Sequence, residues 1–184
     1  KDQKDSGSCW AYGTYASLES YLLPSETWDF SENNMKNLLT PYYPDSFDSY
    51  EGGTTLMSVS YLARWSGPVA ETDDPYDPHS SISPKGLPAV KHVQEILFIP
   101  DREDALDNEN IKLALQEYGA FATAMYMDST IFDAVNNSYY YDGQESYNHL
   151  VAIVGWDDSF DKNKFYPAAP GDGAFIVKNS WGSD

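Results

Sequence analysis

Hydrophobic positions in the first third of the chain recur with the spacing of a helix. Apolar side chains return every three or four residues, and prolines or glycines interrupt the pattern. The helices predicted from this pattern span residues 9–23, 31–40 and 55–65. Ser31 is a favoured N-cap for the second of them, and Gly67 ends the third. The first half of the chain is therefore predicted to be helical.

Shorter apolar runs of the kind that form strands follow in the second half. The predicted strands span residues 93–99, 121–127, 150–156 and 174–178. One helix interrupts them, with Asn108 as its expected N-cap and Gly119 as its C-terminal stop. This order predicts a single α+β domain over residues 1–184, with a helical lobe at about 1–92 and a β-rich lobe at about 93–184.

Composition narrows the class of partner. The chain has 184 residues, of which 41% are hydrophobic, and no apolar run approaches the length of a membrane span. Its net charge of −18 argues against nucleic acid and anionic membranes, because their phosphates would repel it. The chain opens on a charged loop and stops just after a Trp-Gly pair, so we expect the polypeptide to continue at both ends.

The only cysteine, Cys9, stands where the first predicted helix begins. A single cysteine forms no intrachain disulfide. The helix dipole and the free backbone N–H groups at this end favour a thiolate over a thiol. A thiolate is a nucleophile, and it needs a base and a group that orients that base.

Candidates for both groups lie on later strands. His149 opens a strongly apolar strand, which would hold its ring rigidly at the strand end. The next strand runs into Asn179, whose side-chain oxygen can accept a hydrogen bond from one imidazole N–H. Trp181 can keep water away from that hydrogen bond. The other two histidines lie in polar surroundings and are expected to be solvated.

These segments together resemble the papain family of cysteine peptidases. The main motifs are residues 3–10, 148–156 and 178–182, and further landmarks follow in order at 30–34, 52–53, 71–76 and 111–126. His149 follows Cys9 by about 140 residues, within the family's range of roughly 130–150. The resemblance covers nearly the whole chain. It implies a papain-like fold with the active site in a cleft between a helical lobe and an antiparallel β-barrel-like lobe.

The resemblance also implies roles for individual residues. Cys9 would be the nucleophile, and His149 the base and later the acid. Asn179 would orient His149, and Trp181 would shield the pair. Gln3 would form the oxyanion hole together with the backbone N–H of Cys9. The resemblance implies neither a cofactor nor a metal, and the scattered aspartates lack the regular spacing of a calcium loop.

The family's substrate groove matches a second set of residues. The implied substrate-binding residues are Gly52, Gly53, Thr54, Thr55, Ala124, Asn148, Leu150 and Trp181. Many relatives carry alanine where Leu150 stands. We therefore expect a pocket for small or medium apolar side chains, two residues before the scissile bond.

Ser6 is the main departure from the family pattern. Relatives usually carry a cysteine there, bonded to another near the double glycine, and both are missing here. The loop before Cys9 must therefore be held by packing and hydrogen bonds. The departure favours a prokaryotic secreted or cell-surface branch over a lysosomal one. The partners that the resemblance implies for this chain are protein or peptide substrates, a propeptide and appended adhesion or lectin-like modules.

An endopeptidase that acts through a thioester acyl-enzyme is the leading interpretation. Two alternatives stay open: an inactive papain-like module that serves binding or adhesion, and a cytosolic aminopeptidase of the bleomycin-hydrolase type. The complete set of Cys9, His149, Asn179 and Gln3 argues against the first. One free cysteine in a reducing compartment fits the second. A transglutaminase-like fold typically uses aspartate where Asn179 stands.

Overall fold

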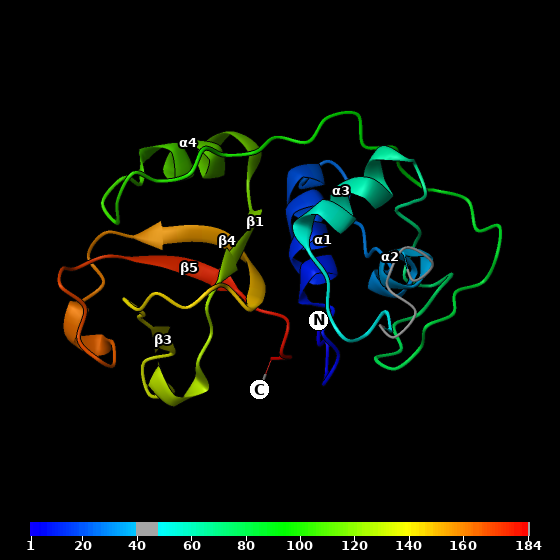
Figure 1. The fold of residues 1–184 in the computed structure, drawn as a ribbon. Coiled ribbons are helices and arrows are strands. Elements are labelled where there is room, and N and C mark those ends of the chain that lie inside the picture. Colours follow the sequence, from blue (N-terminus) through cyan, green and yellow to red (C-terminus); the bar gives the residue numbers. More distant parts are fainter. Residues whose placement is uncertain (40–47, 184) are drawn as a thin grey trace.

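One long helix separates the other helices of the first half from the strands of the second half. The computed structural model describes residues 1–39 and 48–183. Its helices are α1 (Cys9–Leu22), α2 (Glu32–Leu39), α3 (Thr55–Ala63) and α4 (Glu109–Tyr118). In Figure 1, α2 and α3 lie on one side of α1 and the sheet lies on the other. Helix α1 therefore contacts both halves of the molecule.

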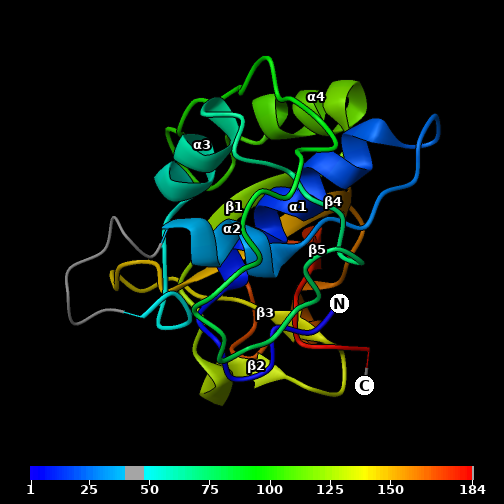
Figure 2. The same ribbon diagram turned by 90° about the vertical axis from the view of Figure 1, so that its right-hand side faces the viewer.

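The main sheet is antiparallel and has β4 at its centre. It contains β1 (Phe121–Met125), β4 (His149–Asp157) and β5 (Ala174–Lys178), in the order β1-β4-β5. A separate ladder pairs β2 (Phe132–Asp133) with β3 (Ser138–Tyr139), and two 3₁₀ turns are η2 (Ser129–Ile131) and η3 (Lys162–Lys164). Seen from the side in Figure 2, α1 crosses in front of β1 and β4, which it contacts.

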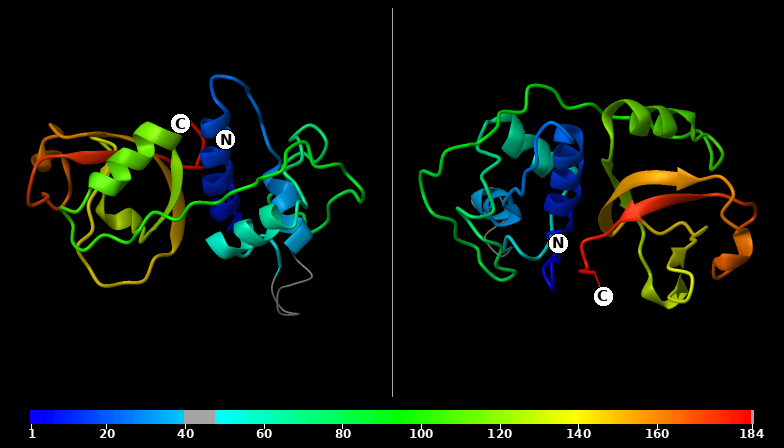
Figure 3. Two further views of the ribbon diagram at one scale, coloured as in Figure 1. Left: turned by 90° about the horizontal axis from the view of Figure 1, so that it is seen from above. Right: turned by 180° about the vertical axis from the view of Figure 1, so that it is seen from behind.

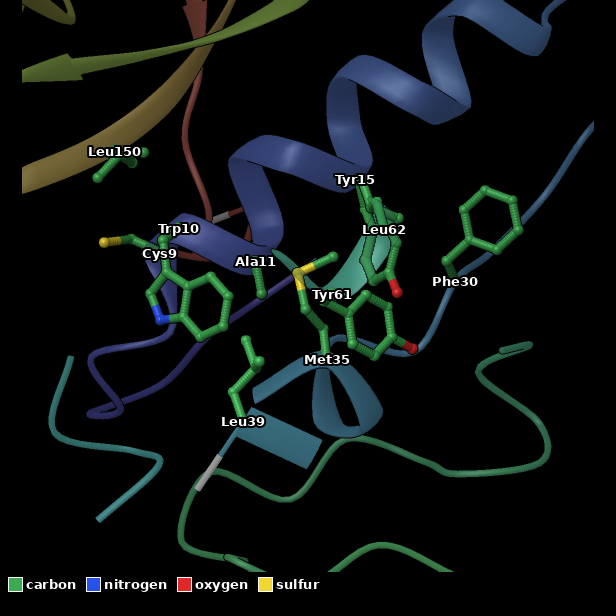
Figure 4. Packing of buried hydrophobic residues seen from close by; sticks show 10 residues of the cluster. All are labelled: Cys9, Trp10, Ala11, Tyr15, Phe30, Met35, Leu39, Tyr61, Leu62 and Leu150. Atoms are coloured by element: carbon green, nitrogen blue, oxygen red, sulfur yellow. The ribbon is translucent and has the colours of Figure 1, made fainter. Parts of the chain in front are cut away.

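The buried cluster that holds the helices together has residues from all of α1, α2 and α3. Figure 4 shows its members: Cys9, Trp10, Ala11, Tyr15, Phe30, Met35, Leu39, Tyr61, Leu62 and Leu150. Leu150 is the member that comes from β4, so the core of the helices reaches the sheet where β4 begins. Burying large apolar and aromatic side chains in this way is the main source of stability for such a layer.

The two ends of the described chain lie side by side, as Figure 3 shows. Asp2 and Trp181 form an isolated antiparallel bridge, and the N–H of Gln3 donates to the carbonyl of Ser180 at 2.8 Å. The residues just before α1 are therefore held against the residues just after β5.

The α+β class and the four helices are confirmed, each helix within two residues of the predicted bounds. Ser31 is an N-cap as predicted, because its Oγ accepts from the N–H of Asn34 at 2.9 Å. Asn108 precedes α4 but makes no cap hydrogen bond, since its Oδ1 accepts from Arg102 instead. The predicted end of the second helix, at residue 40, lies outside the described residues.

The strand predicted at residues 93–99 is wrong, because this segment forms no regular element. Val93 and Ile96 pack against the helical core, whereas Leu97 and Phe98 are exposed. The apolar run thus covers the core while the chain crosses to the sheet side, as Figure 1 shows. The strand predicted at 121–127 ends at Met125, and the side chain of Asn148 binds the backbone beyond it.

A buried carboxylate ties the start of α2 to the loop that follows α3. Asp74 accepts hydrogen bonds from the side-chain amides of Asn33 at 2.8 Å and Asn34 at 3.0 Å. Its backbone carbonyl accepts from Ser31 Oγ at 2.5 Å. All four residues are buried. A loop with no regular structure is thereby fixed to the start of a helix.

We predict that Asp74→Ala lowers the free energy of unfolding by about 2–4 kcal/mol, because it leaves two buried amides without acceptors. Urea denaturation followed by circular dichroism measures the change. Its neighbour Asp73 is exposed, so Asp73→Ala is the matched control and should stay within about 0.5 kcal/mol of the wild type. Equal effects of the two substitutions would contradict the role of Asp74.

Candidate active site

Cys9 is the first residue of α1 and faces β4. Its side chain is 8% exposed, and its sulfur points toward the side of the helix where Leu150 lies (Figure 4). Burial raises the pKa of the Cys9 thiol. Backbone N–H groups of Leu150, Trp10 and Cys9 itself oppose this by hydrogen bonding to the sulfur, which lowers the pKa. The thiol is therefore largely shielded from water, while nearby backbone N–H groups favour its thiolate form.

His149 begins β4 and is bound to the end of β5. Its Nε2 lies 2.8 Å from Asn179 Oδ1, and because that oxygen only accepts, Nε2 carries the proton. The ring stacks on Trp181 with centroids 5.0 Å apart, and only 6% of His149 is exposed. Burial lowers the pKa of His149, and the hydrogen bond to Asn179 raises it. The predicted set of His149, Asn179 and Trp181 is thus brought together.

Leu150 connects these two groups. Leu150 shares a buried cluster with Cys9, its backbone N–H lowers the pKa of that thiol, and it directly follows His149 in the chain. With Nε2 bonded to Asn179, the free lone pair of the ring is on Nδ1. The site therefore holds a thiol at a helix start and, next to the leucine that packs in its cluster, a histidine that can accept a proton and is oriented by an amide.

Gln3 is buried against Ser180, the residue that follows Asn179, with 6% of its surface exposed. Its Nε2 donates to the carbonyl of Ser6 at 2.6 Å, and its Oε1 accepts from Ser180 Oγ at 2.5 Å. Both ends of the amide are therefore fixed. Ser180 was not singled out from the sequence, although it directly follows Asn179.

The loop before Cys9 is held without a disulfide, as expected from Ser6. The N–H of Gly7 donates to the carbonyl of Tyr50 at 2.6 Å, and Ser6 Oγ donates to the same oxygen at 3.5 Å. Gly7 packs so closely that a Cβ there would lie 2.6 Å from the backbone of Glu51. Lys4 adopts a left-handed φ of 57°, which turns the chain within this loop.

The predicted groove residues lie around the same helix end. A Cβ on Gly53 would lie 2.3 Å from the indole nitrogen of Trp10, so the glycine allows this loop to pass over the indole ring. Thr54 is the exposed N-cap residue of α3, and Thr55 is its first residue. Gly52 immediately precedes them. These positions place the double glycine against the start of α1.

Ala124, Leu150 and Asn148 come from the sheet. Ala124 pairs with Leu150 across β1 and β4, and Ala124 is exposed whereas Leu150 is buried. Asn148 is exposed, but both ends of its side-chain amide are bonded to the backbone of Met127, at 2.7 Å and 3.0 Å. Its side chain therefore fixes the ends of β1 and β4. Trp181 is 48% exposed beside His149.

The remaining histidines lie apart from the pair. His79 Nε2 is 3.2 Å from Asp5, and His92 stacks on Trp65. Within residues 1–39 and 48–183, no three histidine, cysteine or acidic side chains gather as metal ligands would. In the same part of the chain, no helix has the length and hydrophobicity needed to cross a bilayer.

The comparison with known proteins identifies the class. The model of the papain family cysteine protease matches residues 1–184, so the chain belongs to that family. The fold is papain-like, as the sequence resemblance implied.

The similar proteins include two animal cathepsins and a bacterial surface layer associated protein. The chain is 27% identical to procathepsin L of Felis catus, of which it covers 53%, and 28% identical to cathepsin K of Gallus gallus, of which it covers 51%; each match includes 100% of this chain. The structure of the cysteine protease and lectin-like domains of Cwp84, a surface layer associated protein of Clostridium difficile, superposes with a TM-score of 0.84 at 29% identity. That match covers 99% of this chain and 42% of Cwp84. The chain thus spans about half the length of these relatives.

Substitutions at Asn179 should move the pKa of His149 in opposite directions. Asn179→Ala removes the acceptor that raises this pKa, so we expect the pKa to fall below its wild-type value. Asn179→Asp adds a negative charge at the same place, so we expect it to rise. Nuclear magnetic resonance titration of the imidazole measures both. Asn163→Ala, in an exposed turn, is the control that should leave it unchanged.

Proposed function

We propose that this chain is the peptidase domain of a cysteine endopeptidase, with Cys9 as nucleophile and His149 as general base. The observation that carries the proposal is the hydrogen bond of His149 Nε2 to Asn179 Oδ1 at 2.8 Å, beside a buried thiol at the start of α1. This bond fixes the tautomer and leaves Nδ1 for the proton of the thiol. Membership of the family supports the same assignment.

The first half of the reaction forms a thioester. His149 Nδ1 takes the proton of Cys9, and the sulfur attacks the carbonyl carbon of the peptide bond. The resulting tetrahedral intermediate collapses, and the proton on Nδ1 passes to the nitrogen of the leaving amine. In the second half, His149 takes a proton from water, the hydroxide attacks the thioester, and the acid product leaves as Cys9 regains its proton. Burial excludes other water from the pair.

The oxyanion of both intermediates needs donors already in place. We assign this role to the side-chain amide of Gln3 and the backbone N–H of Cys9. Ser180 Oγ and the carbonyl of Ser6 hold that amide on either side, so it need not reorganise during the reaction. Each such donor typically contributes about 3–4 kcal/mol to lowering the barrier.

We propose that residues 1–184 form one domain of two lobes, divided near residue 92, within a longer polypeptide. Its partners are protein or peptide substrates, a propeptide and further adhesion or lectin-like modules. The precursor form of procathepsin L and the lectin-like domain of Cwp84 support this. Likeness to a surface layer associated protein also supports an extracellular or cell-surface location and a prokaryotic source.

The endopeptidase activity is tested with an internally quenched peptide whose N-terminus is blocked. We expect cleavage at an internal bond, and a loss of about 1,000-fold or more in kcat for Cys9→Ala, because no other nucleophile replaces the thiol. A thiol-directed peptide epoxide should label the wild type and leave Cys9→Ala unlabelled. Cleavage of free N-termini alone would instead indicate an aminopeptidase. Failure to cleave any peptide would indicate a binding module.

We also propose that the pocket two residues before the scissile bond takes small or medium apolar side chains. Leu150 and Ala124 are register partners on adjacent strands, and antiparallel partners share one face of a sheet. We assign the opposite wall to Thr54 and Thr55, which lie at the start of α3. A leucine instead of alanine at position 150 makes the pocket shallower.

We predict that Leu150→Ala shifts the preference at this subsite toward larger side chains such as Phe, because it removes volume from the wall. The measurement is the cleavage profile of a peptide library, expressed as kcat/KM, and the preference for Phe over Val should rise by about tenfold. Leu113→Ala, an exposed position on α4, is the control and should keep the wild-type profile. A wild-type profile that favours Phe, Tyr or Arg would rule out the proposed pocket.

A further inference from the structure

The hydroxyl of Tyr76 joins the two ends of the loop that precedes Cys9. It donates to the carbonyl of Gln3 at 2.9 Å and lies 2.7 Å from Ser8 Oγ. Because the proton of Tyr76 goes to Gln3, the proton of Ser8 Oγ goes to Tyr76. The hydroxyls of Ser8 and Tyr76 therefore form a chain of hydrogen bonds that ends on Gln3.

The ring of Tyr76 is fixed independently of its hydroxyl. It meets Tyr12 edge-on, with centroids 5.2 Å apart and planes at 79°. Its backbone N–H donates to Glu71 Oε1 at 2.7 Å. The loop of residues 71–76 can therefore present this hydroxyl at a constant place, 68 positions away in sequence from Ser8.

Ser8 occupies a position where a serine side chain usually caps the helix. It is the N-cap residue of α1, and a serine there usually accepts a hydrogen bond from the N–H of the second or third helical residue. Ser8 makes no such side-chain hydrogen bond, and its φ and ψ of −91° and 12° depart from the extended conformation of a usual N-cap. Its hydroxyl is turned to Tyr76 instead.

The orientation of the Ser8 hydroxyl determines which backbone N–H groups of the first turn of α1 are free to hydrogen-bond to the Cys9 sulfur. The third residue, Ala11, already donates to the carbonyl of Ser8 at 2.9 Å. The N–H of the second, Trp10, lies in the first turn, where N–H groups have no partner within the helix, and its hydrogen bonding lowers the pKa of the Cys9 thiol. A capping serine hydroxyl would compete for that N–H of Trp10. Turning Ser8 toward Tyr76 removes the competitor.

We propose that Tyr76 is a positioning residue of the reaction: its hydroxyl keeps Ser8 from capping α1 and holds the backbone of Gln3 in register with Cys9. The proposal rests on the proposed function of Cys9 and Gln3, and it adds a residue that touches neither the substrate nor the reacting atoms. One hydroxyl thus sets both the nucleophile and the oxyanion donor.

The test measures how the rate of Cys9 alkylation by iodoacetamide depends on pH. Tyr76→Phe keeps the ring and its edge contact with Tyr12, and it frees the Ser8 hydroxyl to bind the N–H of Trp10. We expect alkylation at about pH 6 to slow by about tenfold, with convergence on the wild-type rate at high pH, because the thiolate is the reacting form. In the peptidase assay kcat should fall while KM stays the same.

The matched control is Tyr61→Phe. The Tyr61 hydroxyl is also buried in the helical half, and it donates to Asn34 Oδ1 at 2.7 Å, away from the loop. This variant should lose stability and keep the wild-type alkylation profile. A profile for Tyr76→Phe within twofold of the wild type at every pH would overturn the proposal.

Replacing Ser8 tests the mechanism separately. Ser8→Ala removes the competing hydroxyl, so in the Ser8→Ala, Tyr76→Phe double variant the low-pH alkylation rate should return to within about twofold of the wild type. Ser8→Ala alone should keep the wild-type pH dependence of alkylation, which can be measured even where Tyr76→Phe does not fold. Slower alkylation of Ser8→Ala at low pH would overturn the proposal.

Alkylation needs no peptide hydrolysis. A chain that cleaves no peptide but shows these alkylation profiles would therefore contradict the proposed peptidase function and still support the placement of Tyr76. If the chain cleaves peptides but Tyr76→Phe leaves the alkylation profile unchanged, the peptidase function is supported and the role of Tyr76 is contradicted. The two proposals can thus fail independently.

Discussion

The packing of α1 against β4 is the contact on which the rest of the site depends. Cys9 begins one of these elements and His149 begins the other, so their separation is set by how closely helix and strand approach. Gly13 permits that approach, because a Cβ there would already lie 3.3 Å from the carbonyl of Val151. Leu150 then packs in the same buried cluster as Cys9, and its N–H lowers the pKa of the thiol. If the sheet were displaced from α1, Cys9 and His149 would be too far apart to react together.

Hydrogen bonds of side chains and backbone hold the loop before Cys9, where the family usually has a disulfide. The backbone carbonyl of Tyr50 accepts from Gly7, and the hydroxyl of Tyr76 donates to the carbonyl of Gln3. Ser180 Oγ donates to the side-chain amide of Gln3. Each bond contributes only about 1 kcal/mol, so the rigidity of the loop comes from several of them acting on few residues. This makes the loop sensitive to single hydroxyl groups, whereas a covalent link would make it tolerant of their loss.

Burial and hydrogen bonding oppose each other at both reacting groups. Removal from water disfavours the thiolate of Cys9 and the imidazolium of His149, while N–H donors favour the first and Asn179 favours the second. Burial is the larger influence at both groups, so the pKa of Cys9 is raised and the pKa of His149 is lowered. Trp181 contributes to the exclusion of water by covering the ring of His149.

The sequence by itself predicted the helices and the strands of the main sheet, because apolar periodicity is a local property of the chain, and it named the residues of the candidate site through the resemblance of its motifs to a known family. It did not determine residues 93–99, whose apolar run covers the helical core without a partner strand. Nor did it reveal that Asn148 binds the backbone of Met127, or that Tyr76 and Ser180 support Gln3. Those contacts join positions from about 20 to about 180 residues apart, and hydroxyl and amide groups leave no periodic pattern that names their partner. Only the tertiary structure, through the approach of α1 to the sheet, decided them.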